Sequence, residues 1–235
     1  MKPLVKIARR LAFRIWSRRV RTGLSRADAC RLYDFDLVID PGVLHPRHFA
    51  SSRFLAAWLS RIDLKDRRVA DIGTGSGLLA LIAARAGASV VASDISPAAV
   101  ECARANAARN RLGDRIVVME SDVWGDLPLS PPVDLVVTNP PFYPRAVESA
   151  ADHPFASGEG HAFIRRLAEG LRARLAPSGS LLMIHSSDED FAPVEHQLAE
   201  HGLRGTVVAE RRGIFETLTI REFRSAPSEP GRPLR

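Results

Sequence analysis

The sequence has few of the features that mark secreted or membrane-spanning proteins. It contains only two cysteines, Cys30 and Cys102, which lie far apart in the chain. Such a pair supports neither a disulfide framework nor a cysteine-based zinc site, and it fits a reducing compartment. No apolar run approaches the roughly 18 residues that a membrane-spanning helix needs, so we expect a cytoplasmic protein. With 46% hydrophobic and 26% charged residues, the 235-residue chain has the composition of a globular protein.

Acidic residues are absent from the first 26 positions, which carry nine lysines and arginines. The rest of the chain holds 24 basic and 27 acidic residues, a net charge of −3, although the whole chain has a net charge of +6. Apolar residues recur at helical spacing in the first segment, with basic residues opposite. Residues 1–34 are therefore predicted as a basic amphipathic arm. It could pack on the domain, contact RNA or another acidic surface, or act as a targeting sequence.

Residues 35–39 are predicted as a short extended stretch and residues 54–62 as a helix. From residue 68, strands and helices alternate, which predicts an α/β fold with a doubly wound parallel sheet. A helix over residues 161–175 is predicted to end at Pro177-Ser178-Gly179. Two β-rich runs, at 205–210 and 216–223, follow the last helix. The link between them around Gly213 is too short for a crossover, so these two strands should be antiparallel. We predict one α/β domain over residues 35–224. Residues 225–235 are predicted as a disordered tail because the last ten positions contain three prolines.

A glycine-rich loop follows the first strand of the regular pattern and opens a helix. It runs from Asp71 to Gly77, and its glycines allow the backbone to approach a ligand closely. The spacing matches neither the dinucleotide fingerprint nor a triphosphate-binding loop. Asp94 ends the next strand, where a carboxylate can accept the ribose hydroxyls of a nucleoside. Asp122 follows the third strand, where it can reach an adenine edge. These positions predict a nucleoside-containing ligand across the strand ends.

The stretches VADIGTGSG, VVASDIS and ESDVW, in this order, resemble the class I S-adenosylmethionine-dependent methyltransferases. The resemblance implies a Rossmann-like sheet of seven strands with the last strand antiparallel, and S-adenosylmethionine as the cofactor. It also implies that Ser51 and Ser52 line the site of the cofactor carboxylate. The residues implied to bind the cofactor are Asp71, Gly73, Thr74, Gly75, Gly77, Asp94, Ile95, Asp122, Val123 and Asn139.

The tetrapeptide Asn139-Pro140-Pro141-Phe142 follows the strand predicted over residues 134–138. Its prolines stiffen the backbone, so the Asn139 side-chain oxygen and the Pro140 carbonyl can both accept hydrogen bonds from one NH₂ group. Phe142 can stack on a flat amide or base. Positioning of this kind can lower a barrier by about 7–11 kcal/mol, so we predict these four residues to be catalytic. The tetrapeptide resembles the signature of methyltransferases that act on planar nitrogens: glutamine amides, adenine N6, cytosine N4 or guanine N2.

Residues 155–166 resemble the glycine-rich segment and helix of the HemK-type protein-glutamine N5-methyltransferases, and residues 213–223 resemble the final strands of the short branch of that family. The resemblance implies a glutamine side chain in a translation release factor as the substrate. N6-adenine methylation of ribosomal or transfer RNA, a small-molecule acceptor and a non-catalytic cofactor-sensing module are the alternatives. We expect a monomer.

The histidines do not predict a metal centre. His45 and His48 are three residues apart, but no third ligand at a suitable spacing accompanies them. His153 and His161 flank the segment after the Asn-Pro-Pro-Phe sequence and are predicted to lie in a surface loop. Tyr143 and Arg145 are candidates for contacts with the substrate.

Overall fold

The computed structural model describes residues 26–141, 158–214 and 216–225. It begins with an antiparallel hairpin of β1 (Asp28–Leu32) and β2 (Phe35–Ile39), joined by Tyr33 and Asp34 with positive φ angles. The sequence analysis predicted β2 but no strand before it. Most β1 side chains are exposed, so this strand carries no apolar alternation that a sequence pattern could reveal. Residues 1–25 of the predicted arm lie outside the described residues.

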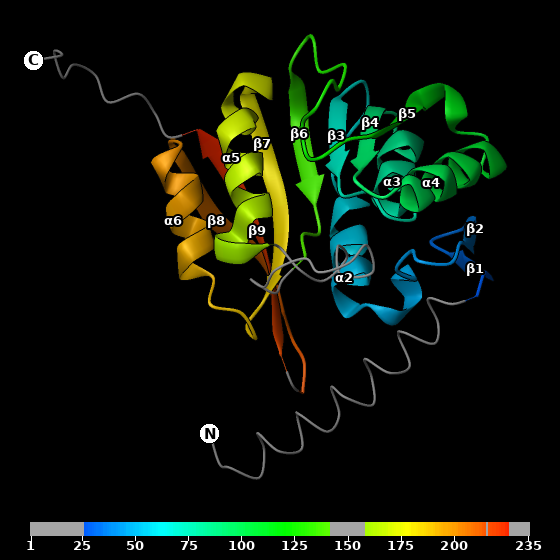
Figure 1. The fold of residues 1–235 in the computed structure, drawn as a ribbon, viewed down its shortest axis with the longest axis horizontal. Coiled ribbons are helices and arrows are strands. Elements are labelled where there is room, and N and C mark those ends of the chain that lie inside the picture. The colour runs from blue at the N-terminus through cyan, green and yellow to red at the C-terminus, as the bar shows by residue number, and fades with distance from the viewer. Residues whose placement is uncertain (1–25, 142–157, 215, 226–235) are drawn as a thin grey trace, which may run out of the picture.

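A seven-stranded sheet forms the centre of the domain (Figure 1), with the strand order β5-β4-β3-β6-β7-β9-β8. Neighbouring strands from β5 to β7 are parallel, whereas β9 runs antiparallel to both β7 and β8. The predicted Rossmann-like sheet with an antiparallel last strand is therefore confirmed. The strands are β3 (Arg68–Ile72), β4 (Ser89–Asp94), β5 (Ile116–Glu120), β6 (Val133–Thr138), β7 (Leu175–Ser186), β8 (Leu203–Arg212) and β9 (Thr217–Ser225).

Helices cover both faces of this sheet (Figure 1), and each face has its own apolar core. One core contains the buried residues of α2, α3 and α4, and the other contains those of α5 and α6. The helices are α2 (Ala50–Leu59), α3 (Leu78–Arg85), α4 (Pro97–Arg109), α5 (Ala162–Arg174) and α6 (Ala192–Glu200), with short 3₁₀ turns η1 (Pro46–His48), η2 (Gly113–Arg115) and η4 (Glu159–His161). Within the described ranges, no helix has the length and apolar character needed to cross a membrane.

The ends of some elements differ from the sequence prediction. Helix α2 begins at Ala50 rather than at Phe54. Strand β7 begins at Leu175 and includes Pro177 and Gly179, which were predicted to end the preceding helix. The pairing of β6 with β7 shifts register between Val133 and Leu135. This irregularity accommodates the turn-like residues within the strand.

The hairpin before the sheet is attached to α4 and to the glycine loop through one buried side chain. The Asn106 carboxamide accepts a hydrogen bond from the Val38 N–H at 2.9 Å and donates to the Val38 carbonyl at 3.0 Å. It also donates to the Ser76 carbonyl at 3.0 Å. Since Asn106 is fully buried, it satisfies these polar groups where water does not reach them. The hairpin therefore supports the loop that follows β3.

Candidate active site

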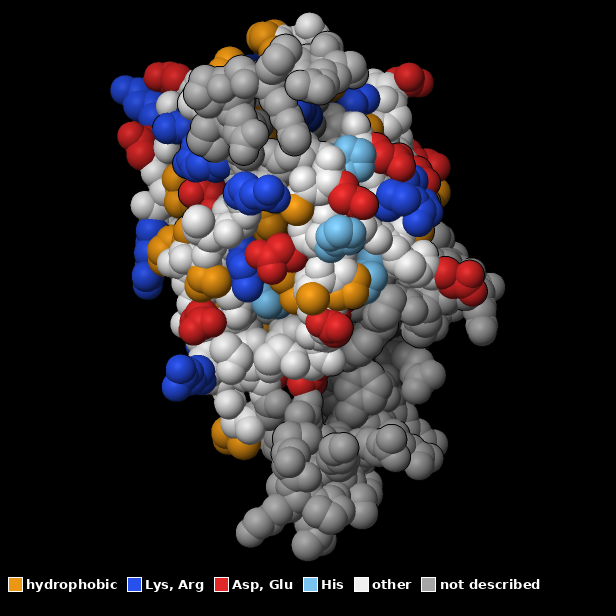
Figure 2. All heavy atoms as spheres, turned by 90° about the vertical axis from the view of Figure 1, so that its left-hand side faces the viewer, with side chains coloured by type: hydrophobic (Ala, Val, Ile, Leu, Met, Phe, Trp, Pro, Cys, Tyr) orange, Lys and Arg blue, Asp and Glu red, His pale blue; other side chains and the backbone are white. Residues whose placement is uncertain are grey.

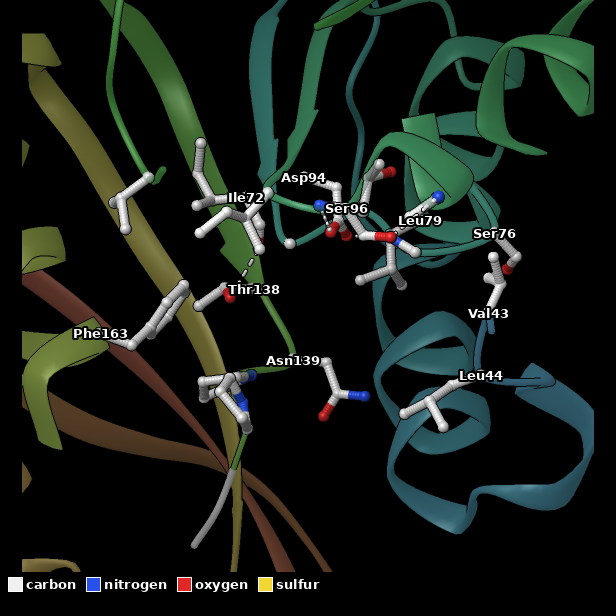
Figure 3. Close-up of a pocket in the computed structure, with 18 of the residues that line it drawn as sticks. Val43, Leu44, Ile72, Ser76, Leu79, Asp94, Ser96, Thr138, Asn139 and Phe163 are labelled. Carbon is white, nitrogen blue, oxygen red and sulfur yellow. Dashed lines mark hydrogen bonds between the residues drawn. The ribbon is translucent and has the colours of Figure 1, made fainter. Parts of the chain in front are cut away.

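A cavity of about 450 Å³ opens at the carboxyl ends of β3, β4 and β6 (Figure 3), the edge at which open α/β sheets bind ligands. The loops after these strands line it, together with the segment before α2 and the first turns of α5. The predicted cofactor-site and catalytic residues in the lining are Gly73, Thr74, Gly75, Asp94, Ile95, Asp122, Val123, Asn139, Pro140 and Pro141. Asp71 and Gly77 belong to the predicted set but lie behind the cavity wall.

The glycines of the loop have two different roles. Gly73 and Gly75 have positive φ angles of 76° and 55°, and a Cβ atom at either position would meet nothing within 4 Å. The bare backbone therefore borders open space that a ligand can enter. Gly77 caps α3, and a Cβ atom there would lie 3.2 Å from Ala103 in α4. Gly77 thus permits close packing of two helices and does not line the cavity.

Asp71 is fully buried beneath the loop and holds its shape. Its Oδ2 accepts hydrogen bonds from the Thr74 hydroxyl at 2.7 Å and from the Ala80 N–H at 3.0 Å. Its Oδ1 has no hydrogen-bond partner among the described residues. Burial raises the pKa of Asp71 to about 7, although the two hydrogen bonds oppose this shift. The buried acid therefore retains one unused acceptor.

The Asp94 carboxylate is oriented by backbone groups on both sides. Oδ2 accepts a hydrogen bond from the Gly75 N–H at 2.9 Å, and Oδ1 accepts one from the Ser96 N–H at 3.0 Å. The Asp94 carbonyl accepts the Ser121 N–H at 2.9 Å, which joins the ends of β4 and β5. These contacts hold the carboxylate at the cavity wall, of which Asp94 is part.

The loop after β5 forms the next part of the wall. Val123 has a φ of 63°, a strained conformation for a β-branched residue of the kind that clusters at functional sites. Asp122 forms an ion pair with Arg166 of α5. Phe163 of α5 lines the cavity (Figure 3), and so does Arg166 of the same helix. Neither residue was predicted to have a function. The spacing of these two residues in the sequence does not indicate a ligand site, because only the tertiary packing of α5 brings them to this loop.

Asn139 directly follows β6, and its side chain extends into the cavity (Figure 3). The preceding residue, Thr138, fixes the end of the strand by donating its hydroxyl proton to the Ile72 carbonyl at 2.8 Å. The Asn139 Nδ2 donates to the Ser52 hydroxyl oxygen at 3.1 Å. The Asn139 Oδ1 is buried without a hydrogen-bond partner in the described parts of the chain. The predicted Phe142, Tyr143 and Arg145 lie outside those parts.

These features fit S-adenosylmethionine, the cofactor implied by the resemblance. Open space above Gly73 and Gly75 can accept its amino-acid moiety, and an anchored carboxylate at Asp94 can accept a ribose diol. The Asn139 Oδ1, in the cavity lining, is an acceptor that an amine or amide ligand can satisfy. The volume of the cavity lies in the range of small-ligand sites.

The pair of histidines near α2 has a third acidic neighbour that the sequence spacing did not reveal. Asp28, His45 and His48 offer ligand atoms that lie within 4.8 Å of one another. Asp28 reaches the pair because it lies in β1, the strand that was not predicted. However, the His45 Nδ1 accepts the Arg47 N–H at 3.2 Å, which leaves the proton on Nε2, 3.2 Å from Asp28. In this state Nε2 carries a proton and is not available to a metal ion.

The prediction that His161 lies in a surface loop was wrong, since only 6% of this residue is exposed. His161 stands at the start of α5, and its Nδ1 lies 3.4 Å from Oε1 of the equally buried Glu189. Burial lowers the pKa of His161 and, with a smaller contribution from Asp190, raises that of Glu189 to about 7. Both groups therefore favour their neutral forms. His153 lies outside the described residues.

Comparison with known proteins identifies the family. A model of the methyltransferase small domain matches residues 34–216. A release factor glutamine methyltransferase from Neisseria gonorrhoeae is 34% identical over 203 residues, covering 81% of this chain and 72% of that protein. One from Xylella fastidiosa is 35% identical over 172 residues, covering 68% of this chain but only 62% of its own length.

A solved structure of similar fold is the Thermus thermophilus 16S rRNA N2 G1207 methyltransferase in complex with AdoMet and guanosine. It is 25% identical, has a TM-score of 0.57, and the alignment covers 85% of this chain and 50% of the other. The sheet topology agrees with these matches. The chain belongs to the methyltransferase small-domain family, and it is a class I S-adenosylmethionine-dependent methyltransferase.

Proposed function

We propose that this protein methylates the side-chain amide nitrogen of a glutamine in another protein, and that the acceptor is a translation release factor in the cytoplasm. The observation that carries the proposal is the Asn139 Oδ1, a buried acceptor without a partner among the described residues, in the lining of the cavity. Relatives named release factor glutamine methyltransferases, at 34–38% identity, support the choice of a protein glutamine.

The chain's own residues would hold the cofactor and position the acceptor. Asp94 and the glycine loop would hold S-adenosylmethionine, which supplies a methyl group on a positively charged sulfur when bound. The Asn139 Oδ1 and the Pro140 carbonyl would each accept one N–H of the substrate amide. Because an amide nitrogen shares its lone pair with the carbonyl, it is a weak nucleophile, and two acceptors on its hydrogens favour a pyramidal nitrogen with a localised lone pair. The effect is one of positioning, so no strong general base is needed.

RNA is the competing class of acceptor, because the rRNA methyltransferase named above shares this fold. A nucleic-acid surface needs basic side chains gathered in a stripe or patch. The face formed by α5, α6 and β8 instead shows acidic and basic side chains interspersed (Figure 2). Among its described residues, this face therefore shows no such patch for RNA.

The test uses two parallel reactions, both of which contain the protein and isotopically labelled S-adenosylmethionine. One reaction also contains a release factor, and the other contains ribosomal and transfer RNA. We expect label on one glutamine of the release factor, located by mass spectrometry of its peptides, and none after that glutamine is changed to alanine. Asn139→Ala should strongly reduce the rate of labelling, to a level that can still be measured, while leaving the unfolding temperature unchanged. Label that appears on RNA and not on protein would overturn the proposal.

A further inference from the structure

The Asn139 carboxamide is held by a side chain from a distant part of the sequence. Its Nδ2 donates a hydrogen bond to the Ser52 hydroxyl at 3.1 Å, across 87 positions of the chain. Figure 3 shows the nitrogen of Asn139 on the side of Leu44 and α2, with the oxygen turned away from that side. We propose that Ser52 is a positioning residue that fixes the Asn139 carboxamide with its oxygen free for the acceptor amide. This inference rests on the proposed function of Asn139.

The need for such a residue follows from the symmetry of the carboxamide. Its oxygen and its NH₂ group have almost the same shape, and a rotation of 180° would present donors to an acceptor that is itself an NH₂ group. Two donors cannot satisfy each other. With the Asn139 nitrogen bonded to Ser52, the oxygen remains as the only acceptor of the carboxamide. A hydrogen bond donated by Nδ2 also polarises the amide and increases the negative charge on Oδ1.

Ser52 is well placed for this role because α2 is rigidly packed. Leu55, Ala56 and Leu59 on the same helix are completely buried in the core. Bonded side chains on a packed helix hold a site more accurately than loop residues do. On the other side, the Thr138 hydroxyl bonds to the Ile72 carbonyl and fixes the backbone that carries Asn139. The backbone and the side chain of Asn139 are therefore fixed from two different elements.

Ser52 also lines the cavity, so a direct contact with the cofactor carboxylate is the competing role. The two roles predict different measurements. Loss of a cofactor contact would raise the dissociation constant for S-adenosylmethionine. Loss of a positioning contact would lower the turnover number and leave that dissociation constant unchanged.

We therefore expect Ser52→Ala to lower the turnover number about three- to tenfold, the usual effect of removing one neutral hydrogen bond. The dissociation constant of S-adenosylmethionine, measured by calorimetry, should change less than twofold. Ser52→Thr, which keeps the hydroxyl, should restore turnover. The matched control is Ser60→Ala at the other end of α2, where the hydroxyl donates to the Ala57 carbonyl at 3.0 Å and touches no part of the cavity.

A second measurement needs no turnover. The side-chain NH₂ signals of Asn139 in a ¹⁵N NMR spectrum can be assigned by their loss in Asn139→Ala. In Ser52→Ala these signals should shift, and their protons should exchange faster with water, whereas Ser60→Ala should leave them in place. Unmoved signals, or a Ser52→Ala variant that changes only the cofactor dissociation constant, would overturn the inference.

The double variant separates this inference from the proposed function. If Ser52 acts through Asn139, adding Ser52→Ala to Asn139→Ala should cause no further loss of turnover. If Asn139→Ala loses activity and Ser52→Ala is fully active, the role of Ser52 is overturned but the proposed function is not. A fully active Asn139→Ala would overturn the proposed function and, with it, the role of Ser52.

Discussion

The Nε of Arg166 lies 3.2 Å from the Oδ1 of Asp122, so the helix α5 and the loop after β5 meet through an ion pair in the lining of the cavity. The same two elements are joined a second time by Trp124, whose Nε1 donates to the carbonyls of Arg166 and Leu167, both at 3.0 Å. The wall predicted to face adenine is therefore built from two elements that lie more than forty positions apart.

Breaking this ion pair should weaken cofactor binding modestly. We expect Arg166→Ala to raise the dissociation constant of S-adenosylhomocysteine about two- to fivefold, because partly exposed pairs contribute about 0.2–1 kcal/mol. Calorimetry at low and high salt would measure it, and Arg166→Lys should lie between the wild type and Arg166→Ala. The difference should shrink at high salt. Equal dissociation constants of the wild type and Arg166→Ala at low salt would show that the ion pair with Asp122 does not contribute to cofactor binding.

Gly170 allows α5 to approach Trp124. A Cβ atom at this position would overlap the Trp124 ring. Gly170→Ala should therefore lower the free energy of unfolding by about 1–3 kcal/mol, because the ring or the helix must move. Urea unfolding would measure this loss. Gly113→Ala is the matched control, since a Cβ atom there would meet nothing within 4 Å, and an unfolding midpoint equal to that of the control would contradict the prediction.

The raised pKa of Asp71 leads us to expect that the free energy of unfolding depends on pH. Burial raises its pKa in the folded protein from 3.8 to about 7, so between these values the folded state binds more protons than the unfolded state. The stability associated with protonated Asp71 is complete below about pH 4 and is lost as the pH rises through 7. The slope reaches at most about 1.4 kcal/mol per pH unit. Asp71→Asn keeps an oxygen for Thr74 and Ala80 and should flatten the curve.

The measurement is the free energy of unfolding in urea from pH 5 to pH 8 for the wild type and Asp71→Asn. We expect the variant to be the more stable protein at pH 8, because it has no buried carboxylate to ionise there. Parallel pH curves for the two proteins would show that Asp71 does not titrate in this range.

Asp94→Asn should impair both the loop and the ligand site. The carboxylate accepts one N–H on each oxygen, so an amide group would place its NH₂ against either Gly75 or Ser96. An unsatisfied donor of this kind costs about 1–3 kcal/mol. We expect the dissociation constant of S-adenosylmethionine to rise at least tenfold by calorimetry. Asp126→Asn, an exposed position that does not line the cavity, is the control and should bind like the wild type.

The sequence predicted those parts of the site that depend on local order. The glycine loop, Asp94 and Asp122 each follow a strand, and parallel strands end at one edge of a sheet, so their positions along the chain were sufficient. Asn139 followed the same rule at the end of β6.

The contributions of Ser52 and Arg166 depend on packing and could not be predicted in this way. Ser52 reaches Asn139 only because the apolar side of α2 packs into the core, and Arg166 reaches Asp122 only because Gly170 lets α5 approach Trp124. Neither residue belongs to a motif whose spacing indicates a partner. Strand β1 was missed for a different reason, since its exposed residues do not alternate between apolar and polar.

The Asn106 carboxamide links Val38 of the hairpin to Ser76 of the glycine loop through hydrogen bonds. This link limits how far the protein can be shortened at its N-terminal side. The family match starts at position 34, which is inside the tight bend between β1 and β2. A fragment cut there would keep β2 and discard the neighbour it pairs with along its whole length. The smallest fragment able to bind its cofactor should therefore start upstream of Asp28, even though those residues never touch the ligand.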